Sequence, residues 1–274
     1  MRKRWVLPER PAVVITGASS GIGEACAYRF ARAGSRLALL ARRVDRLHDV
    51  AARARELGSQ VHVLAVDLAE ESAVTRALTD AESALGEIDV LINNAGFGLY
   101  APLETVRRED VERLFAVNTF GPLAAIQAAL PGMRRRERGL IINVSSIVGK
   151  RAIPMTGAYG ASKYALHGLS DALRVELRGS GVEIAVVCPG FTKSEFSDKV
   201  IDYGVERGRP RAGAMSAEAV ADVIFECARR PRPEILLTGK GRTLAWLQRI
   251  SPKLADWAIA RTVTVRLPEV EPNP

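Results

Sequence analysis

Tyr159 and Lys163 stand four residues apart in the stretch Y-G-A-S-K (159–163). On a helix this spacing places both side chains on the same face. Free tyrosine titrates near ~10 and free lysine near ~10.4, so neither group alone exchanges protons readily at neutral pH. A cation close to the phenol favours phenolate, and the lysine could therefore tune the tyrosine for proton transfer. Because the spacing is common in helices, the rest of the sequence has to decide between a surface pair and a functional one.

A glycine-rich turn stands near the start of the chain. The stretch T-G-A-S-S-G-I-G (16–23) follows the apolar run V-V-I-T (13–16) and places Gly17, Gly21 and Gly23 before a helical pattern. Glycines at such a turn let the backbone approach a pyrophosphate at the helix N-terminus. A plain tight turn explains a glycine cluster equally well. The position at the first strand-to-helix junction favours the nucleotide site.

The residues after the second apolar run bear on the choice of cofactor. A dinucleotide site meets the adenosine ribose there, where an acidic side chain binds the 2′-hydroxyl and repels a 2′-phosphate. The chain has Arg42 and Arg43 at this point and no acidic residue before Asp45, while Ser19 and Ser20 add hydroxyl donors in the turn. The alternative is a solvated arginine pair that opens a helix, where cations are slightly unfavourable. This cost favours NADP(H) over NAD(H).

Short apolar runs alternate with longer amphipathic ones along most of the chain. Strand-like runs occupy 13–16, 36–41, 61–66, 89–93, 140–144, 183–188 and 234–238, and helical patterns lie between them, the longest over about 109–136. This alternation predicts a parallel sheet with helices on both faces, which right-handed crossovers turn into a doubly wound α/β fold. With no linker before residue 240, we expect one domain, 1–241, and a C-terminal extension, 242–274, that is not an independent domain.

Composition limits the classes of protein. The 274 residues include 47% hydrophobic and 26% charged residues, as in ordinary soluble proteins. The net charge of +8 comes from scattered cations without an aromatic-basic stripe, so we expect no nucleic-acid binding. The basic N-terminus lacks the features of a signal peptide, and we expect a cytoplasmic protein. Cys26, Cys188 and Cys227 should be buried free thiols, and the histidines show no ligand spacing, so no metal site is expected.

Together the motifs resemble the classical branch of the short-chain dehydrogenase/reductase family. In the family's order the chain carries T-G-A-S-S-G-I-G (16–23), D-L (67–68), N-N-A-G (93–96), F-A-V-N-T (115–119), N-V-S-S (143–146), Y-G-A-S-K (159–163) and P-G-F-T (189–192). Each motif alone is weak, but the full set is specific and spans about residues 12–238. The resemblance implies a Rossmann-type doubly wound sheet and an NADP(H)-dependent oxidoreductase that interconverts a carbonyl and a secondary alcohol.

The resemblance also assigns roles by position. Tyr159 would exchange the proton, and Lys163 would lower its pKa and bind the nicotinamide ribose. Ser146 would donate to the substrate oxygen, and Asn118 would hold a water of a proton relay. The implied cofactor-binding residues are Gly17, Ser19, Ser20, Gly21, Ile22, Gly23, Arg42, Arg43, Asp67, Leu68, Asn94, Ala95, Gly96, Tyr159, Lys163, Pro189, Gly190 and Thr192.

Simpler interpretations stay open for parts of this set. Ser146 and Asn118 could only satisfy backbone groups at a strand end and a helix bend, and Tyr164 is expected to pack. A catalytically silent NADP-binding sensor or scaffold is the main alternative for the whole chain. The intact tetrad argues against it, because a silent relative could lose Tyr159 or Lys163 freely.

Apolar residues beside the motifs bear on the substrate. They favour a lipophilic ketone or aldehyde, or the corresponding alcohol, over a small charged substrate. The region 191–215 continues as a polar, glycine-rich stretch, which suits a lid, with an ordinary surface loop as the alternative. The apolar residues are Phe97, Leu99, Tyr100, Ile153, Pro154, Met155, Phe191 and Phe196.

The C-terminal extension predicts two helices. Leu244, Leu247 and Ile250 share one helical face, and Ser251-Pro252 fits the N-cap and first residue of a second helix that carries Trp257. The stretch 262–267 alternates like an edge strand, and 269–274 should be disordered. The extension resembles that of hydroxysteroid-dehydrogenase-like members, some of which are dimers. The apolar face of the extension has to be covered, and we expect a homodimer contact or the chain's own core to cover it. A membrane surface is the least favoured cover, and a tetramer is an alternative assembly.

Overall fold

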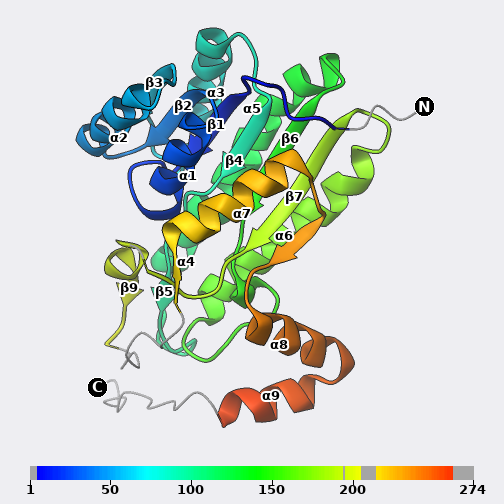
Figure 1. Ribbon diagram of the computed structural model, residues 1–274. Helices are drawn as coiled ribbons and strands as arrows, with labels where there is room; N and C mark the ends of the chain where they lie inside the picture. Colours follow the sequence, from blue (N-terminus) through cyan, green and yellow to red (C-terminus); the bar gives the residue numbers. More distant parts are fainter. Residues whose placement is uncertain (1–4, 194, 205–213, 262–274) are drawn as a thin grey trace.

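The computed structural model describes residues 5–193, 195–204 and 214–261, and its centre is a seven-stranded parallel sheet (Figure 1). The strand order is β11-β7-β6-β4-β1-β2-β3. All seven runs predicted from the sequence lie in this sheet, with bounds that differ by at most two residues. The strands are β1 (Ala12–Thr16), β2 (Arg36–Ala41), β3 (Val61–Ala65), β4 (Val90–Asn93), β6 (Gly139–Val144), β7 (Val182–Cys188) and β11 (Glu234–Leu236).

Helices cover both faces of the sheet and enclose two hydrophobic cores. In β1, Val13 and Ile15 belong to one core while Ala12 and Val14 belong to the other, as the alternation of side chains along a strand requires. Strands buried on both faces explain the continuous apolar runs. One layer contains α1 (Gly21–Ala31), α2 (Val44–Glu56) and α7 (Ala217–Arg229), and the other contains α3 (Glu71–Leu85), α5 (Gly121–Arg135) and α6 (Gly157–Glu176).

The sheet changes its winding direction between β1 and β4. β1 pairs with β2 on one side and with β4 on the other, so the chain crosses the sheet after β3. In doubly wound sheets, ligands bind in the crevice outside the carboxyl ends of the strands at such a point. The fold therefore brings the glycine-rich turn after β1 beside the N-N-A-G motif at the end of β4.

The long helix predicted over 109–136 is interrupted in its middle. α4 (Arg108–Phe115) and α5 are joined by a π-helical segment, Ala116–Phe120, which contains Asn118. Such segments are rare and often occur at functional sites. By length and composition alone Arg108–Arg135 could cross a membrane, but half of its most apolar part is buried inside the protein, as in a core helix.

Two short strand pairs hold the segment that follows β7. β8 (Thr192–Lys193) pairs with β10 (Met215–Ser216), and β9 (Ile201–Asp202) pairs with β5 (Leu99–Tyr100). Between β8 and β9 a 3₁₀ turn, η3, spans Glu195–Lys199. The region predicted as a lid is therefore paired with the body at β5, its two ends pair with each other through β8 and β10, and 205–213 lies outside the described residues.

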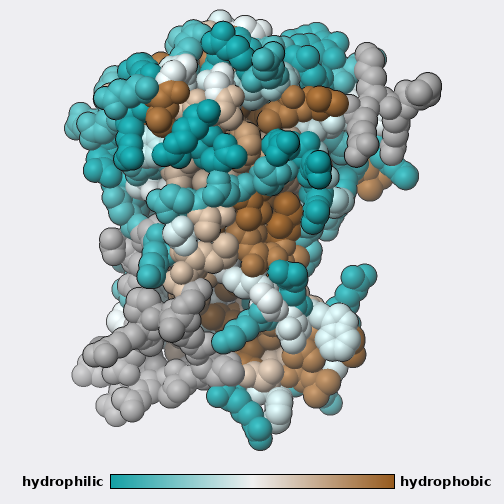
Figure 2. All heavy atoms as spheres, viewed as in Figure 1, coloured by the Kyte–Doolittle hydropathy of each residue, from teal (hydrophilic) through white to brown (hydrophobic). Residues whose placement is uncertain are grey.

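Two helices extend the chain beyond β11. They are α8 (Gly239–Ile250) and α9 (Pro252–Ala260), and the predicted N-cap Ser251 and first residue Pro252 of α9 are confirmed. Trp246 and Trp257 are 61% and 57% exposed, and Figure 2 shows apolar side chains over these helices at the lower right. The predictions for 262–267 and 269–274 lie outside the described residues, and the boundary after 241 stays a prediction.

Phe30 offers a test of the core between α1 and α7. Its ring is fully buried and meets Phe225 edge-on, with 5.1 Å between the centroids. Phe30→Ala should lower the free energy of unfolding by about 3–5 kcal/mol, because it removes buried apolar area and leaves a cavity. Urea denaturation measures this loss. The control Phe120→Ala, at a site that is 59% exposed, should stay within about 0.5 kcal/mol of the unchanged protein, and equal losses in the two variants would contradict the assigned core.

Candidate active site

A cavity of about 580 Å³ opens at the carboxyl ends of β1, β4, β6 and β7. It is lined at one end by the glycine-rich turn and Arg42, and at the other by Tyr159 and the aromatic residues of the β8–β9 segment. Among the residues predicted to bind cofactor or to take part in chemistry, all except Gly23 and Asn118 line this cavity. The fold thus collects distant motifs into one site, since Gly17 and Thr192 are 175 positions apart in the sequence.

The glycine-rich turn is packed tightly against the loop after β4. Gly17 has a φ of +67°, and a Cβ there would lie 2.7 Å from the Cα of Ala95. A Cβ on Gly23 would lie 2.3 Å from the carbonyl oxygen of Gly17. Asn94 fastens the contact, because its Nδ2 donates to the carbonyl oxygens of Thr16 at 3.0 Å and Gly17 at 3.2 Å. Gly23 and Asn94 therefore shape the turn.

Two arginines at the end of β2 face the same turn. Arg43 donates from Nη2 to the Oγ and the carbonyl oxygen of Ser19, both at 3.3 Å. Arg42 lies 3.7 Å from a carboxylate oxygen of Asp67, a predicted cofactor-binding residue two positions after β3. Both arginine side chains line the cavity and keep at least 40% of their surface exposed.

Tyr159 and Lys163 lie on one face of α6 and are both buried. Tyr159 forms a side-chain hydrogen bond with Ser146, which caps the short 3₁₀ helix η2 (Ile147–Gly149) after β6. The Nζ of Lys163 donates to the carbonyl oxygen of Val144 at 3.1 Å. The predicted pair is thus placed between the end of β6 and the cavity, with the serine next to the tyrosine.

The electrostatics of the pair differ from the expectation that Lys163 lowers the pKa of Tyr159. Burial raises the pKa of Tyr159, the hydrogen bond with Ser146 opposes this rise, and Tyr100 adds to it. Burial also lowers the pKa of Lys163 to about 8. The protein groups alone therefore hold the tyrosine in its protonated form, because desolvation of the phenolate dominates.

Asn118 is fully buried in the π-helical segment and does not line the cavity. Its Oδ1 accepts from the backbone N–H of Phe97 at 3.0 Å, while Nδ2 donates to the carbonyl oxygen of Phe97 at 3.0 Å and to Ser162 Oγ at 3.1 Å. Both amide hydrogens are engaged, so this side chain fixes the backbone after N-N-A-G. A role in a water relay stays a prediction.

Aromatic and aliphatic groups line the side of the cavity next to Tyr159. The ring of Phe196 lies 5.9 Å from that of Tyr159, centroid to centroid. Of the eight apolar residues predicted beside the substrate, five line the cavity, and Leu99, Pro154 and Met155 do not. Sequence reasoning missed Lys199, which also lines the cavity, because no motif marks it. Tyr164, expected to pack, is instead 41% exposed and donates its hydroxyl to the carbonyl oxygen of Lys150.

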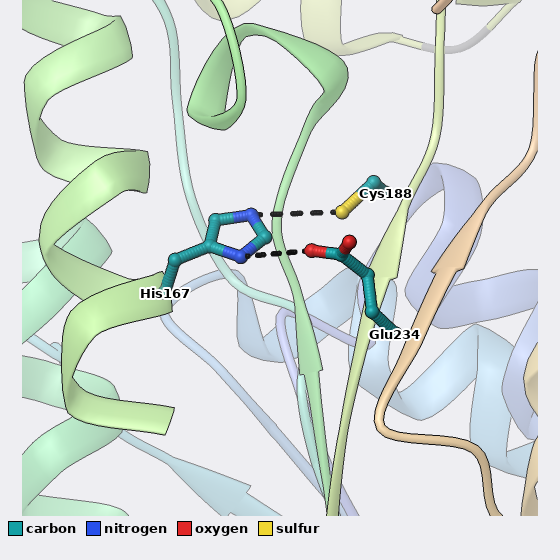
Figure 3. Close-up of side chains that lie close together, drawn as sticks. All are labelled: His167, Cys188 and Glu234. Carbon is teal, nitrogen blue, oxygen red and sulfur yellow. Dashed lines mark hydrogen bonds and ion pairs between the residues drawn. The ribbon is translucent and has the colours of Figure 1, made fainter. Parts of the chain in front are cut away.

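A second polar cluster lies one turn beyond Lys163 on α6 (Figure 3). His167 Nε2 lies 3.6 Å from Cys188 Sγ, and His167 Nδ1 lies 3.3 Å from a carboxylate oxygen of Glu234. The spacing of these residues in the sequence did not predict this cluster. Cys26, Cys188 and Cys227 are buried free thiols, as predicted.

The cluster fits a hydrogen-bonded chain better than a metal site. The two imidazole nitrogens face different partners, and Lys150 Nζ already lies 2.9 Å from the Glu234 carboxylate, which opposes a further cation. Burial lowers the pKa of His167 to about 4 and raises that of Cys188 to about 12. A neutral imidazole has one donor and one acceptor, so Nδ1–H donates to Glu234 and Nε2 accepts from the thiol.

The neutral His167 predicts a dependence of stability on pH. Its pKa is lowered to about 4 in the fold, first by burial and then by Lys150, from 6.5 in an unfolded chain. Between these values the unfolded state binds the extra proton, so stability should fall by about 2–3 kcal/mol as pH drops from 6.5 to 4. Urea denaturation across this range should show a weaker pH dependence for His167→Asn. The exposed control His48→Asn should keep the original dependence, and an unchanged profile in His167→Asn would contradict the assignment.

Comparisons with known proteins agree with this geometry. The family model described as short chain dehydrogenase matches residues 11–202. The Drosophila melanogaster dehydrogenase/reductase SDR family protein 7-like is 34% identical over 258 residues, which cover 91% of this chain and 79% of the relative. Dehydrogenase/reductase SDR family member 7B of Rattus norvegicus is 34% identical over 253 residues, 88% of this chain and 78% of the relative.

Solved structures give the same result. A metagenomic short-chain oxidoreductase in complex with NADP superposes with a TM-score of 0.72 and 33% identity over 84% of this chain and 97% of that chain. A short-chain dehydrogenase/reductase from Burkholderia phymatum in complex with NAD superposes with a TM-score of 0.81 and is 27% identical. The match covers 90% of this chain and 95% of that chain. With a tyrosine, a lysine and a serine gathered at the end of a dinucleotide-type crevice, the chain belongs to the short-chain dehydrogenase/reductase family of oxidoreductases.

Proposed function

We propose that this protein is an NADP(H)-dependent oxidoreductase that transfers a hydride between the nicotinamide and a carbonyl or secondary alcohol. The observation that carries the proposal is the buried Tyr159, hydrogen-bonded with Ser146 and one helical turn from Lys163 at the wall of the cavity. The apolar lining by Phe97, Phe191 and other side chains favours a lipophilic ketone or aldehyde as substrate.

The residues at the other end of the cavity fit a dinucleotide. Gly17 and Gly21 adopt left-handed backbone conformations, with φ of +67° and +57°, and open the turn at the N-terminus of α1. Backbone amides at a helix N-terminus bind phosphate groups well. When bound, the nicotinamide supplies or accepts the hydride. Lys163, Pro189 and Thr192 line the part of the cavity that would hold it.

The protein's own groups handle the proton and the substrate oxygen. Tyr159 holds a proton on its phenolic oxygen and can give it to a developing alkoxide. Ser146 shares a hydrogen bond with this oxygen and can donate to the substrate oxygen beside it. Lys163, whose pKa is lowered to about 8 by burial, holds a second proton nearby. We assign Asn118 the role of fixing Phe97 and the loop after β4.

The preference for NADP(H) rests on the charge at the end of β2. Arg42 and Arg43 stand where an acidic residue would select NAD(H), and Arg43 reaches the hydroxyl of Ser19. Two of the similar solved structures support this, since one is in complex with NADP and another, an alcohol dehydrogenase from Thermococcus sibiricus, is complexed with 5-hydroxy-NADP, while a third is in complex with NAD. No observation favours the alternative of a catalytically silent sensor or scaffold.

Assembly and location complete the proposal. We infer a homodimer in which the exposed Trp246 and Trp257 of α8 and α9 contribute apolar contact area. A tetramer is the alternative assembly. A cytoplasmic location stays a prediction.

Replacement of the tyrosine tests the catalytic assignment. Tyr159→Phe should lower kcat for NADPH-dependent reduction of a lipophilic carbonyl by at least ~100-fold, because the proton donor is lost. NADPH absorbance against a carbonyl panel measures the rate, and NADPH fluorescence titration should show retained binding. Tyr164→Phe, five residues along the same helix and 41% exposed, is the matched control and should keep full activity. Full turnover in Tyr159→Phe would refute the assignment.

Replacement of an arginine tests the cofactor preference. Arg43→Ala should raise the Kd for NADPH by about 10- to 100-fold, because a charge-assisted hydrogen bond to the 2′-phosphate is lost. The Kd for NADH should change little. Arg53→Ala, on the same helix α2 and exposed, is the control for general effects of charge. Equal effects of Arg43→Ala on the two cofactors would count against a 2′-phosphate site at this position.

A further inference from the structure

The carboxylate of Glu195, in the 3₁₀ turn η3, lies among the cations at the mouth of the cavity. Its Oε2 accepts from both Nη1 and Nη2 of Arg43, each at 3.1 Å, and lies 3.2 Å from Lys199 Nζ. Its other oxygen lies 3.4 Å from Arg46 Nη2. One carboxylate therefore pairs with three cations that come from two parts of the chain, the start of α2 and η3.

The same cations reach the glycine-rich turn. Lys199 Nζ donates to Ser20 Oγ at 2.7 Å, and Arg43 Nη2 donates to Ser19 Oγ at 3.3 Å. In Figure 1 the yellow segment that contains η3 lies beside the dark blue turn before α1. These donors, two cations and two hydroxyl groups, are what a phosphate monoester at the adenosine ribose would recruit.

Glu195 is ionised in this position at neutral pH. Its pKa is lowered first by the hydrogen bond with Lys199, an effect that burial opposes, and further by the hydrogen bond with Arg43. A carboxylate and a phosphate at the same cations would repel each other. Because the Glu195 side chain keeps 39% of its surface exposed, its ion pairs are weak enough to be replaced by a ligand with more charge.

The residue after Glu195 connects this contact with the catalytic end of the cavity. The ring of Phe196 packs on Tyr159 at 5.9 Å between centroids and on the backbone at Gly98. Phe196 lines the cavity on the substrate side. A single short turn thus places a carboxylate at the proposed phosphate site and an aromatic ring beside the proposed proton donor.

We propose that Glu195 is a specificity-determining residue that competes with the 2′-phosphate of the cofactor for Arg43 and Lys199. When the phosphate binds, the carboxylate is displaced and η3 moves with Phe196, so that substrate has access to Tyr159 only after the phosphorylated cofactor is in place. This inference rests on the proposed NADP(H) preference. The sequence motifs do not indicate this function of Glu195.

The test compares two small probes, 2′,5′-ADP and 5′-AMP, which differ by the 2′-phosphate. Isothermal titration with the full chain should give Glu195→Gln about 3- to 10-fold tighter binding of 2′,5′-ADP and unchanged binding of 5′-AMP, because three exposed ion pairs no longer compete. The gain should shrink at high salt, since these charges are exposed. Glu176→Gln, exposed and at the far end of α6, is the matched control and should bind both probes as the unchanged protein does.

The outcomes separate this proposal from the cofactor assignment. If the unchanged protein prefers 2′,5′-ADP and Glu195→Gln gains nothing or binds it more weakly, Glu195 is a static ion pair and the competition is refuted, while the NADP(H) preference stands. If neither protein distinguishes the probes, both assignments fall.

Hydrogen–deuterium exchange gives the conformational readout. 2′,5′-ADP should increase exchange in 195–202 of the unchanged protein, whereas Glu195→Gln should show high exchange in this segment without the probe. Exchange that stays unchanged in both proteins would overturn the coupled movement of Phe196.

Discussion

The contact between the turn after β1 and the loop after β4 is the constraint on which the rest of the site depends. Thr16 Oγ1 accepts from the backbone N–H groups of Asn94 and Ala95, at 3.0 and 3.1 Å, and Asn94 returns its amide hydrogens to the turn. A side chain on Gly23 would strike this contact. The winding change of the sheet puts the two segments side by side, and the glycines let them touch. The part of the cavity that would bind phosphate and the part that contains Tyr159 therefore share one continuous wall.

Helix α6 supplies the second half of the arrangement through an unusual buried face. Polar side chains recur on it at intervals of three or four residues, and each bonds to a group at or near the end of β6 or β7. An apolar face would also pack against the sheet, but it would not fix the position of the helix along the direction of the strands. These bonds set where the phenol stands in the cavity. The residues are Tyr159, Lys163, His167 and Ser170.

The sequence predicts what depends on short-range patterns. Apolar runs locate all the strands of the large sheet, and glycines at 17, 21 and 23 locate the turn that lines the cavity. It does not predict the contacts of Glu195 or the cluster of His167 and Cys188, because these join residues whose separation in the chain carries no periodic signal. The π-helical segment at Asn118 is hidden for another reason. Its residues continue the helical pattern on both sides, and only backbone hydrogen bonds such as that from the N–H of Gly121 to the carbonyl oxygen of Ala116 reveal it.

The burial of the tyrosine also bears on the direction of the reaction. Desolvation raises the pKa of Tyr159, so the protein groups alone store a proton on the phenol, which is the form that a developing alkoxide needs. Oxidation of an alcohol needs the phenolate instead, and the neighbouring Lys163 gives it limited support because burial lowers the pKa of that amine to about 8. The further charge that favours phenolate would have to come from an oxidised cofactor. The protein groups alone thus supply the protonated phenol that reduction uses, whereas oxidation would draw on the charge of the cofactor.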